Sequence, residues 1–148
     1  MATVENAIPS QRKRSNIRWG RIVVGAVLSE LAVILVLLGI TLVYIVAIAP
    51  GLTQAQYGEF GRLAGYYVAP TAGAVSTFVV VLLLTRRLDS GFVANGTLTG
   101  IMSVLLTAGF LVSAKPEDRL MYGIAFALRI AAGYLGGLTL QKMSRRSD

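Results

Sequence analysis

The stretch IVVGAVLSELAVILVLLGITLVYIVAIA, residues 22–49, decides the fold class of this chain. It holds one charged residue, Glu30. A helix that crosses the hydrocarbon core of a bilayer needs about 20 predominantly apolar residues. Pro50-Gly51 follows at once and would end a helix there. The stretch is too long for a signal-peptide core, so we expect it to stay in the mature chain as a membrane anchor.

Three more apolar stretches follow, at about 63–84, 92–114 and 120–140. The chain is 55% hydrophobic and only 14% charged, and its apolar residues run on without the alternation expected of a soluble domain of 148 residues. The sequence therefore predicts an all-α membrane protein, a bundle of four transmembrane helices. The expected organisation is a basic, disordered cytoplasmic tail over 1–18, a transmembrane domain over 19–142 and a basic cytoplasmic tail over 143–148.

The net charge is +7, and the basic residues behind it lie mostly at one set of ends of the apolar stretches. Ten basic residues lie before the first stretch, after the second or after the fourth: Arg12, Lys13, Arg14, Arg18, Arg21, Arg86, Arg87, Lys142, Arg145 and Arg146. The opposite loops hold only Arg62, Lys115 and Arg119. Basic residues collect on the cytoplasmic side of membrane proteins. We therefore expect the protein to lie in the cell membrane with both termini in the cytoplasm. We expect it to contact the lipid bilayer and not to bind nucleic acid.

The loop from Pro50 to Arg62 carries a helix-start signal, because Thr53-Gln54-Ala55-Gln56 fits a capping box. A short helix there could lie on the membrane surface, apart from the second span. Pro70 lies near one end of that span and is expected to kink it.

Two further helix starts can be predicted from local sequence. Asp89 or Ser90 is available to cap the third helix. Pro116, with acidic residues after it, suits the first position of the fourth helix.

Small residues recur at four-residue spacing in every span, which gives each helix a flat face where another backbone can approach closely. They are Gly25 and Ser29, then Gly65, Ala69 and Gly73, then Gly96 and Gly100 (continuing to Ser103 and Thr107), then Gly133 and Gly137. We expect these faces to pack the helices of one chain together. The alternative is that Gly133 and Gly137 form a seam between two copies.

Arg129 is the most informative single residue, because it lies near the middle of the fourth stretch. A guanidinium at that depth costs about 2.5–3.5 kcal/mol on insertion scales, so it must face a partner, water or another subunit. The only carboxylate within an apolar stretch is Glu30. Counted from Arg21 it lies roughly 13 Å deep, but counted back from Ala49 it lies at the inner boundary. Both depths stay open.

An ion pair between Glu30 and Arg129 would lower the desolvation cost of both residues. Side chains lean toward the N-terminus of their own helix. In the predicted topology that direction is inward for Glu30 and outward for Arg129, which counts against direct pairing. The sequence leaves the pairing undecided.

The chain has no cysteine and no histidine, which removes thiolate and imidazole chemistry. We expect no cofactor, no metal and no catalytic site, since the other carboxylates lie in tails and loops. The leading hypothesis is a non-enzymatic accessory or assembly subunit, with a second copy or another membrane protein as partner. The alternative is a small proton-coupled transporter or exporter using Glu30 and Arg129, because burial disfavours a charged carboxylate and could let Glu30 trade a proton for a cation.

Overall fold

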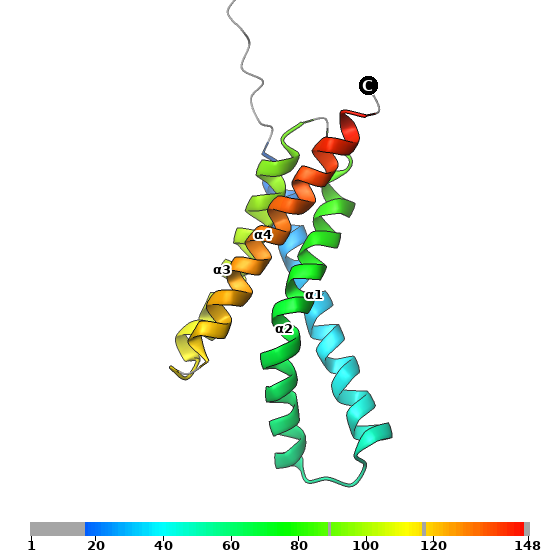
Figure 1. Cartoon of the computed structure of the whole chain (residues 1–148), viewed down its shortest axis with the longest axis vertical. Coiled ribbons are helices and arrows are strands. Elements are labelled where there is room, and N and C mark those ends of the chain that lie inside the picture. The colour runs from blue at the N-terminus through cyan, green and yellow to red at the C-terminus, as the bar shows by residue number, and fades with distance from the viewer. Residues whose placement is uncertain (1–16, 89, 117, 147–148) are drawn as a thin grey trace, which may run out of the picture.

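The computed structural model describes residues 17–88, 90–116 and 118–146 as a bundle of four antiparallel helices (Figure 1). Helix α1 (Trp19–Val43) continues as a π-helical turn, η1 (Tyr44–Ile48), and is followed by α2 (Gln54–Thr85), α3 (Phe92–Ser113) and α4 (Arg119–Ser144). The described part of the chain contains no strand, which confirms the all-α prediction. Most of the predicted N-terminal tail, residues 1–16, lies outside the described residues.

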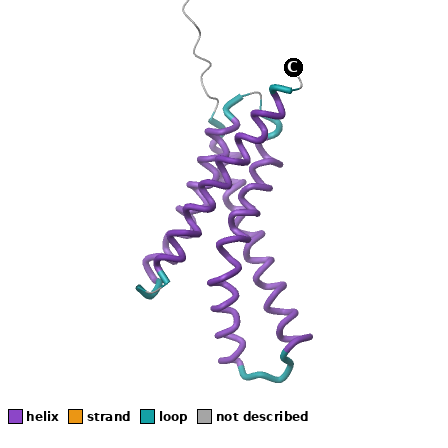
Figure 2. The backbone as a smooth tube through the Cα atoms, in the orientation of Figure 1, coloured by secondary structure: helices purple, strands orange, loops and turns teal. Residues whose placement is uncertain are grey.

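The four helices form two hairpins, α1–α2 and α3–α4. Helix α2 packs against α1 and α4, and α3 packs against α4 and α1, so that α1 and α4 lie on a diagonal of the bundle. The start of α1, the α2–α3 loop and the end of α4 share one end of the molecule, and from there the two hairpins diverge (Figures 1 and 2). We call the other end, where each hairpin turns, the hairpin end.

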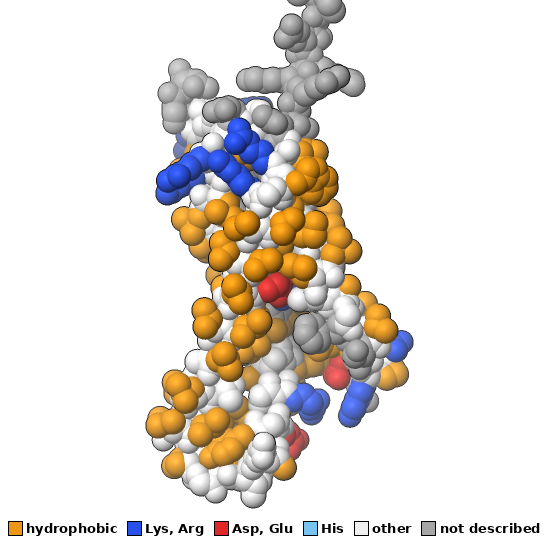
Figure 3. All heavy atoms as spheres, turned by 180° about the vertical axis from the view of Figure 1, so that it is seen from behind, with side chains coloured by type: hydrophobic (Ala, Val, Ile, Leu, Met, Phe, Trp, Pro, Cys, Tyr) orange, Lys and Arg blue, Asp and Glu red, His pale blue; other side chains and the backbone are white. Residues whose placement is uncertain are grey.

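All four helices are long and apolar enough to cross a membrane. Helix α1 exposes large apolar side chains along its outer face, and Leu35, Leu38 and Leu42 are each at least 60% exposed. In Figure 3 apolar side chains cover the flank of the molecule, while Lys and Arg gather at the end that holds the termini and at the tip of the α3–α4 hairpin.

The capping box at the start of α2 is confirmed. The Thr53 side chain accepts from the backbone N–H of Gln56, and the Gln56 side chain accepts from the backbone N–H of Thr53. The prediction of a separate surface helix is wrong, because α2 runs from Gln54 through Pro70 to Thr85 without a break. The first turn of α2 is bound to the residue that follows η1: the Tyr57 hydroxyl donates to the Ala49 carbonyl, 2.9 Å away.

The predicted cap of α3 is also wrong. The N-cap is Gly91, whose φ of +77° lies in the left-handed region that favours glycine. Its carbonyl accepts from both the backbone N–H and the side-chain amide of Asn95. Of the two residues proposed as caps, Asp89 lies outside the described residues and Ser90 precedes the cap.

Pro116 is not the first residue of α4, contrary to the prediction. The helix begins three residues later, at Arg119, with Asp118 as its N-cap. Pro116 belongs instead to a turn, in which its carbonyl accepts from the Arg119 N–H. The turn satisfies this carbonyl before the helix starts.

Glycine faces set the closest contacts inside the bundle. A Cβ on Gly96 would lie 2.4 Å from the Gly133 carbonyl oxygen, and one on Gly137 would lie 2.6 Å from the backbone of α3 at Phe92 and Val93. The Gly133–Gly137 face is thus covered by α3, so a second copy cannot pack on it while this contact is intact.

Of the remaining small residues, some contact another helix and others border open space. Gly25 lies against the Thr99 side chain, and Ser29 is fully buried. A Cβ on Gly65 would meet nothing within 4 Å, so this residue makes no close helix contact in the described structure. Gly65 and Ala69 instead border a cavity.

Candidate functional site

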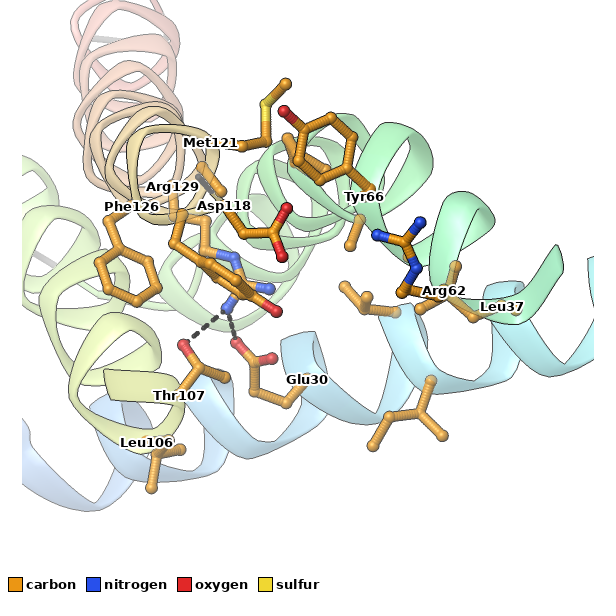
Figure 4. Close-up of a pocket in the computed structure, with 18 of the residues that line it drawn as sticks. Glu30, Leu37, Arg62, Tyr66, Leu106, Thr107, Asp118, Met121, Phe126 and Arg129 are labelled. Atoms are coloured by element: carbon orange, nitrogen blue, oxygen red, sulfur yellow. Dashed lines mark hydrogen bonds and ion pairs between the residues drawn. The ribbon is translucent and has the colours of Figure 1, made fainter. Parts of the chain in front are cut away.

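Glu30 and Arg129 meet inside the bundle, although they come from diagonally opposed helices. Nη1 of Arg129 forms an ion pair with Oε1 of Glu30 (Figure 4). The two side chains are 7% and 16% exposed, so both are largely removed from the surroundings. The arrangement gives the guanidinium the charged partner that its position in an apolar stretch requires.

Helix α3 supplies two hydroxyl groups to the same pair. Ser103 donates to Oε1 of Glu30 and accepts from Nη1 of Arg129 over 3.2 Å. The Thr107 hydroxyl oxygen also lies 3.2 Å from Nη1 and accepts from it. These hydroxyls replace part of the water that a buried charge loses.

Helix α2 also contacts the Arg129 guanidinium, at Gly73, a residue with no side chain. A Cβ on Gly73 would lie 2.5 Å from Nε of Arg129 and 3.0 Å from Nη2. A side chain at position 73 would therefore displace the guanidinium edge that rests on this helix. Nε of Arg129 is itself buried and has no hydrogen-bond partner in the described structure.

The opposed lean of the two side chains does not prevent their contact, and the packing of α3 on α4 explains why. The backbone of α4 at Arg129 lies beside Gly100, where a Cβ would be 2.7 Å from the Arg129 carbonyl oxygen. Along α3, Ser103 lies about one turn and Thr107 about two turns closer to the hairpin end than Gly100 does. By leaning toward its own N-terminus, the guanidinium is brought level with these hydroxyls and with Glu30.

Sequence reasoning named Ser103 and Thr107 only as small residues. Their spacing from Gly96 and Gly100 places all four on one face of α3, the face that contacts α4 near Gly133 and Arg129. Two hydroxyls on the face opposite a buried arginine are a usable signal, because a buried guanidinium needs acceptors.

A second polar layer lies next to the pair and joins α1 to α2. The hydroxyls of Ser29 and Thr77 are hydrogen-bonded at 2.8 Å, and those of Ser29 and Ser76 at 3.1 Å. Ser29 and Thr77 are completely buried. This layer fixes the α1 backbone beside Glu30.

A cavity of about 610 Å³ opens between the two hairpins on the hairpin side of the ion pair. Its floor is formed by Glu30, Arg129 and Thr107, and Arg62 and Asp118 lie at its mouth (Figure 4). Its walls are mostly apolar and include Leu31, Ile34, Leu37, Gly65, Ala69, Pro70, Met121, Tyr122 and Phe126. The site is thus a neutral polar cluster at the base of an apolar space.

Within the described residues no group of three or more His, Cys, Asp or Glu side chains is placed to hold a metal ion. Comparison with protein-family models, with curated proteins and with solved structures finds no match to this chain.

Proposed function

We propose that this chain is an integral membrane protein that crosses the cell membrane four times, keeps both termini in the cytoplasm and acts without catalysis as an assembly partner in a membrane complex. The four long apolar helices support insertion. The excess of Lys and Arg at the terminal end supports the orientation.

The observation that carries this proposal is the use made of Glu30 and Arg129. Their ion pair joins the two hairpins, and Ser103 and Thr107 add α3 to the same cluster. Polar groups that bind one another across the bundle hold the helices in register. A cluster whose polar groups bind one another in this way favours a structural role over a transport path, in which polar groups would bind the substrate in turn.

The α1–α2 hairpin offers a surface for a partner. Toward its tip a Cβ on Gly39 or Gly58 would meet nothing within 4 Å. Val46 and Ile48 of η1 are 67% and 66% exposed. Small and apolar residues of this kind allow another membrane helix to approach closely.

Orientation can be tested directly because the chain has no cysteine of its own. The variants Gln54→Cys and Ser144→Cys place single thiols at opposite ends of the bundle. In intact cells, a membrane-impermeant maleimide should label the first and reach the second only after lysis. The reverse pattern would overturn the orientation.

Assembly is tested in the native membrane. Crosslinking of whole membranes should yield an adduct heavier than the chain, and the purified protein should elute above its monomer mass. A monodisperse monomer in detergent, together with no adduct in membranes, would overturn the assembly proposal.

One observation favours a second candidate, a small proton-coupled transporter: Glu30 lines a cavity large enough for a small molecule. On this proposal, Glu30→Gln abolishes proton-linked flux in proteoliposomes, while the control Glu59→Gln, at an exposed position of α2, leaves flux intact. Protection of Glu30 from a carbodiimide by the transported cation would support it. Unchanged flux in Glu30→Gln, or no flux from the parent protein with a broad substrate panel, would remove it.

A further inference from the structure

Two oppositely charged side chains face the cavity mouth from different helices. Figure 4 shows Arg62 of α2 and Asp118 at the start of α4 reaching toward the same space. Among the described residues neither has an ion-pair partner, since the ion pair found there joins Glu30 to Arg129. Each is therefore available to a charged group of a bound molecule, on opposite sides of one opening.

The charges that line the cavity sum to zero. Glu30 and Asp118 are negative, and Arg62 and Arg129 are positive. The inner two already neutralise each other at the floor. A singly charged ligand would leave net charge in apolar surroundings, which is costly. A ligand that carries one positive and one negative group would instead match the mouth and keep the whole site neutral.

The size and lining of the cavity specify the rest of the ligand. Its volume of about 610 Å³ is within the range of small-molecule sites. Asp118 and Arg129 are eleven residues apart on the α4 side, which gives a depth of roughly 16 Å from mouth to floor. The walls between them are largely apolar side chains, such as Ile34, Leu37 and Phe126. A deep, apolar space beneath a polar mouth suits a hydrocarbon chain.

The approach to the cavity points to the bilayer as the source of the ligand. The cavity is lined by residues of both hairpins, and the hairpins diverge toward the hairpin end (Figure 1). An opening between them faces the surrounding bilayer when the helices are inserted as proposed. Along α2 it is bordered by Gly61 and Gly65, where a Cβ would meet nothing within 4 Å. A flat helix face of this kind leaves room for an acyl chain to enter sideways.

We propose that the cavity binds one zwitterionic phospholipid of the surrounding bilayer. One acyl chain lies between the hairpins above the Glu30–Arg129 pair, the phosphate lies near Arg62, and the ammonium lies near Asp118. This inference rests on the membrane insertion proposed above, whose test by cysteine labelling is independent of lipid binding.

The proposal is tested by native mass spectrometry of the full chain released from detergent micelles. Phosphatidylcholine and phosphatidylglycerol with identical acyl chains are added at equal concentration. We expect one bound phosphatidylcholine per chain, at a several-fold higher occupancy than phosphatidylglycerol. Equal occupancy, or a preference for the anionic lipid, would overturn the zwitterion assignment.

A matched pair of variants locates the site. Gly65→Leu fills the cavity from a position with open space, and Gly123→Leu adds the same side chain to α4 at a position with open space outside the cavity lining. The first should lose most of the bound lipid and the second should keep it, at equal melting temperature. Retention of lipid by Gly65→Leu would overturn the site. Loss of a chain dimer in that variant, with no lipid bound to the parent, would instead assign the space to a partner helix and overturn the lipid proposal.

Substitution of the charges at the mouth tests the headgroup assignment. Asp118→Asn leaves Arg62 as the one charge there, so the preference should move from phosphatidylcholine toward phosphatidylglycerol. Arg62→Gln should lower the occupancy of both lipids. Glu59→Gln, which changes a nearby carboxylate that does not line the cavity, should leave the preference unchanged. An unaltered preference in Asp118→Asn would overturn the role of this carboxylate.

Discussion

Gly96 of α3 and Gly133 of α4 approach each other reciprocally: a Cβ on either residue would lie 2.4 Å from the carbonyl oxygen of the other. The two backbones are therefore in direct contact at this level. About one turn away, the α4 backbone at Arg129 lies against Gly100. The contact between glycines thus positions the residue on which the polar cluster depends.

Substitution of Gly133 by alanine should therefore destabilise the bundle. The added methyl group meets backbone, which cannot rotate away, and overpacking of this kind costs about 1–3 kcal/mol. The measurement is the melting temperature of the purified protein in detergent. Gly123→Ala is the matched control, because the same change on α4 meets open space. Equal stability of the two variants would contradict the close approach.

Arg129→Leu should lower the melting temperature, because it leaves the Glu30 carboxylate buried without its cation. Removing one member of a buried ion pair costs about 3–5 kcal/mol, whereas replacing both members can be neutral. The double variant Glu30→Leu with Arg129→Leu should recover most of the loss. A double variant no more stable than the sum of the single effects would show that the two residues do not act as a pair.

Ser103→Ala should weaken the same cluster to a smaller extent. The serine hydroxyl bridges Glu30 and Arg129, and a hydrogen bond to a charged group contributes about 1.5–3 kcal/mol. In the background of the double leucine variant, the same change should have almost no effect, which a double-mutant cycle would measure. Thr97→Val serves as control, since the Thr97 hydroxyl donates only to the carbonyl of Val93 on its own helix. An equal loss in both backgrounds would contradict the bridging role.

Thr53→Ala should loosen the start of α2 while the centre of the bundle stays intact. Loss of an N-cap costs about 1 kcal/mol, and here the reciprocal contact with Gln56 is lost as well. Hydrogen exchange should rise at Gln56 and Tyr57, whose N–H groups donate to Thr53, and remain unchanged near Arg129. Gln54→Ala, one residue further on, should have little effect. Protection of Gln56 and Tyr57 equal to that of the parent would contradict the cap.

The sequence predicted the helices well because uninterrupted apolar stretches have few other solutions in a membrane. It also selected Glu30 and Arg129, since buried charges are rare enough to stand out. Helix starts were harder to predict. Gly91 caps α3 through its backbone conformation, and Pro116 lies in a turn that is not apparent from its neighbours.

The pairing itself could not be decided from the sequence, because it depends on the register between helices. Side-chain lean alone argued against contact between Glu30 and Arg129. The offset of α4 along α3, set where Gly100 meets the Arg129 backbone, reverses that conclusion. The offset between two packed helices is a feature of the tertiary structure and cannot be predicted from the sequence of either helix alone. The open space beside Gly65 could not be predicted either. Gly65 has the same four-residue spacing from the next small residue as the glycines that do contact another helix.

The unequal lengths of the helices have a consequence for the bilayer itself. The continuous helix Trp19–Ile48 has 30 residues and α3 has 22, which correspond to about 45 Å and 33 Å at 1.5 Å per residue. Inserted as proposed, the protein presents helices of two different lengths on its perimeter. Lipid next to α1 must stretch, or the helix must tilt, whereas lipid next to α3 fits an ordinary bilayer. The bilayer around an upright α1 is thereby expected to be thicker beside the α1–α2 hairpin than beside α3.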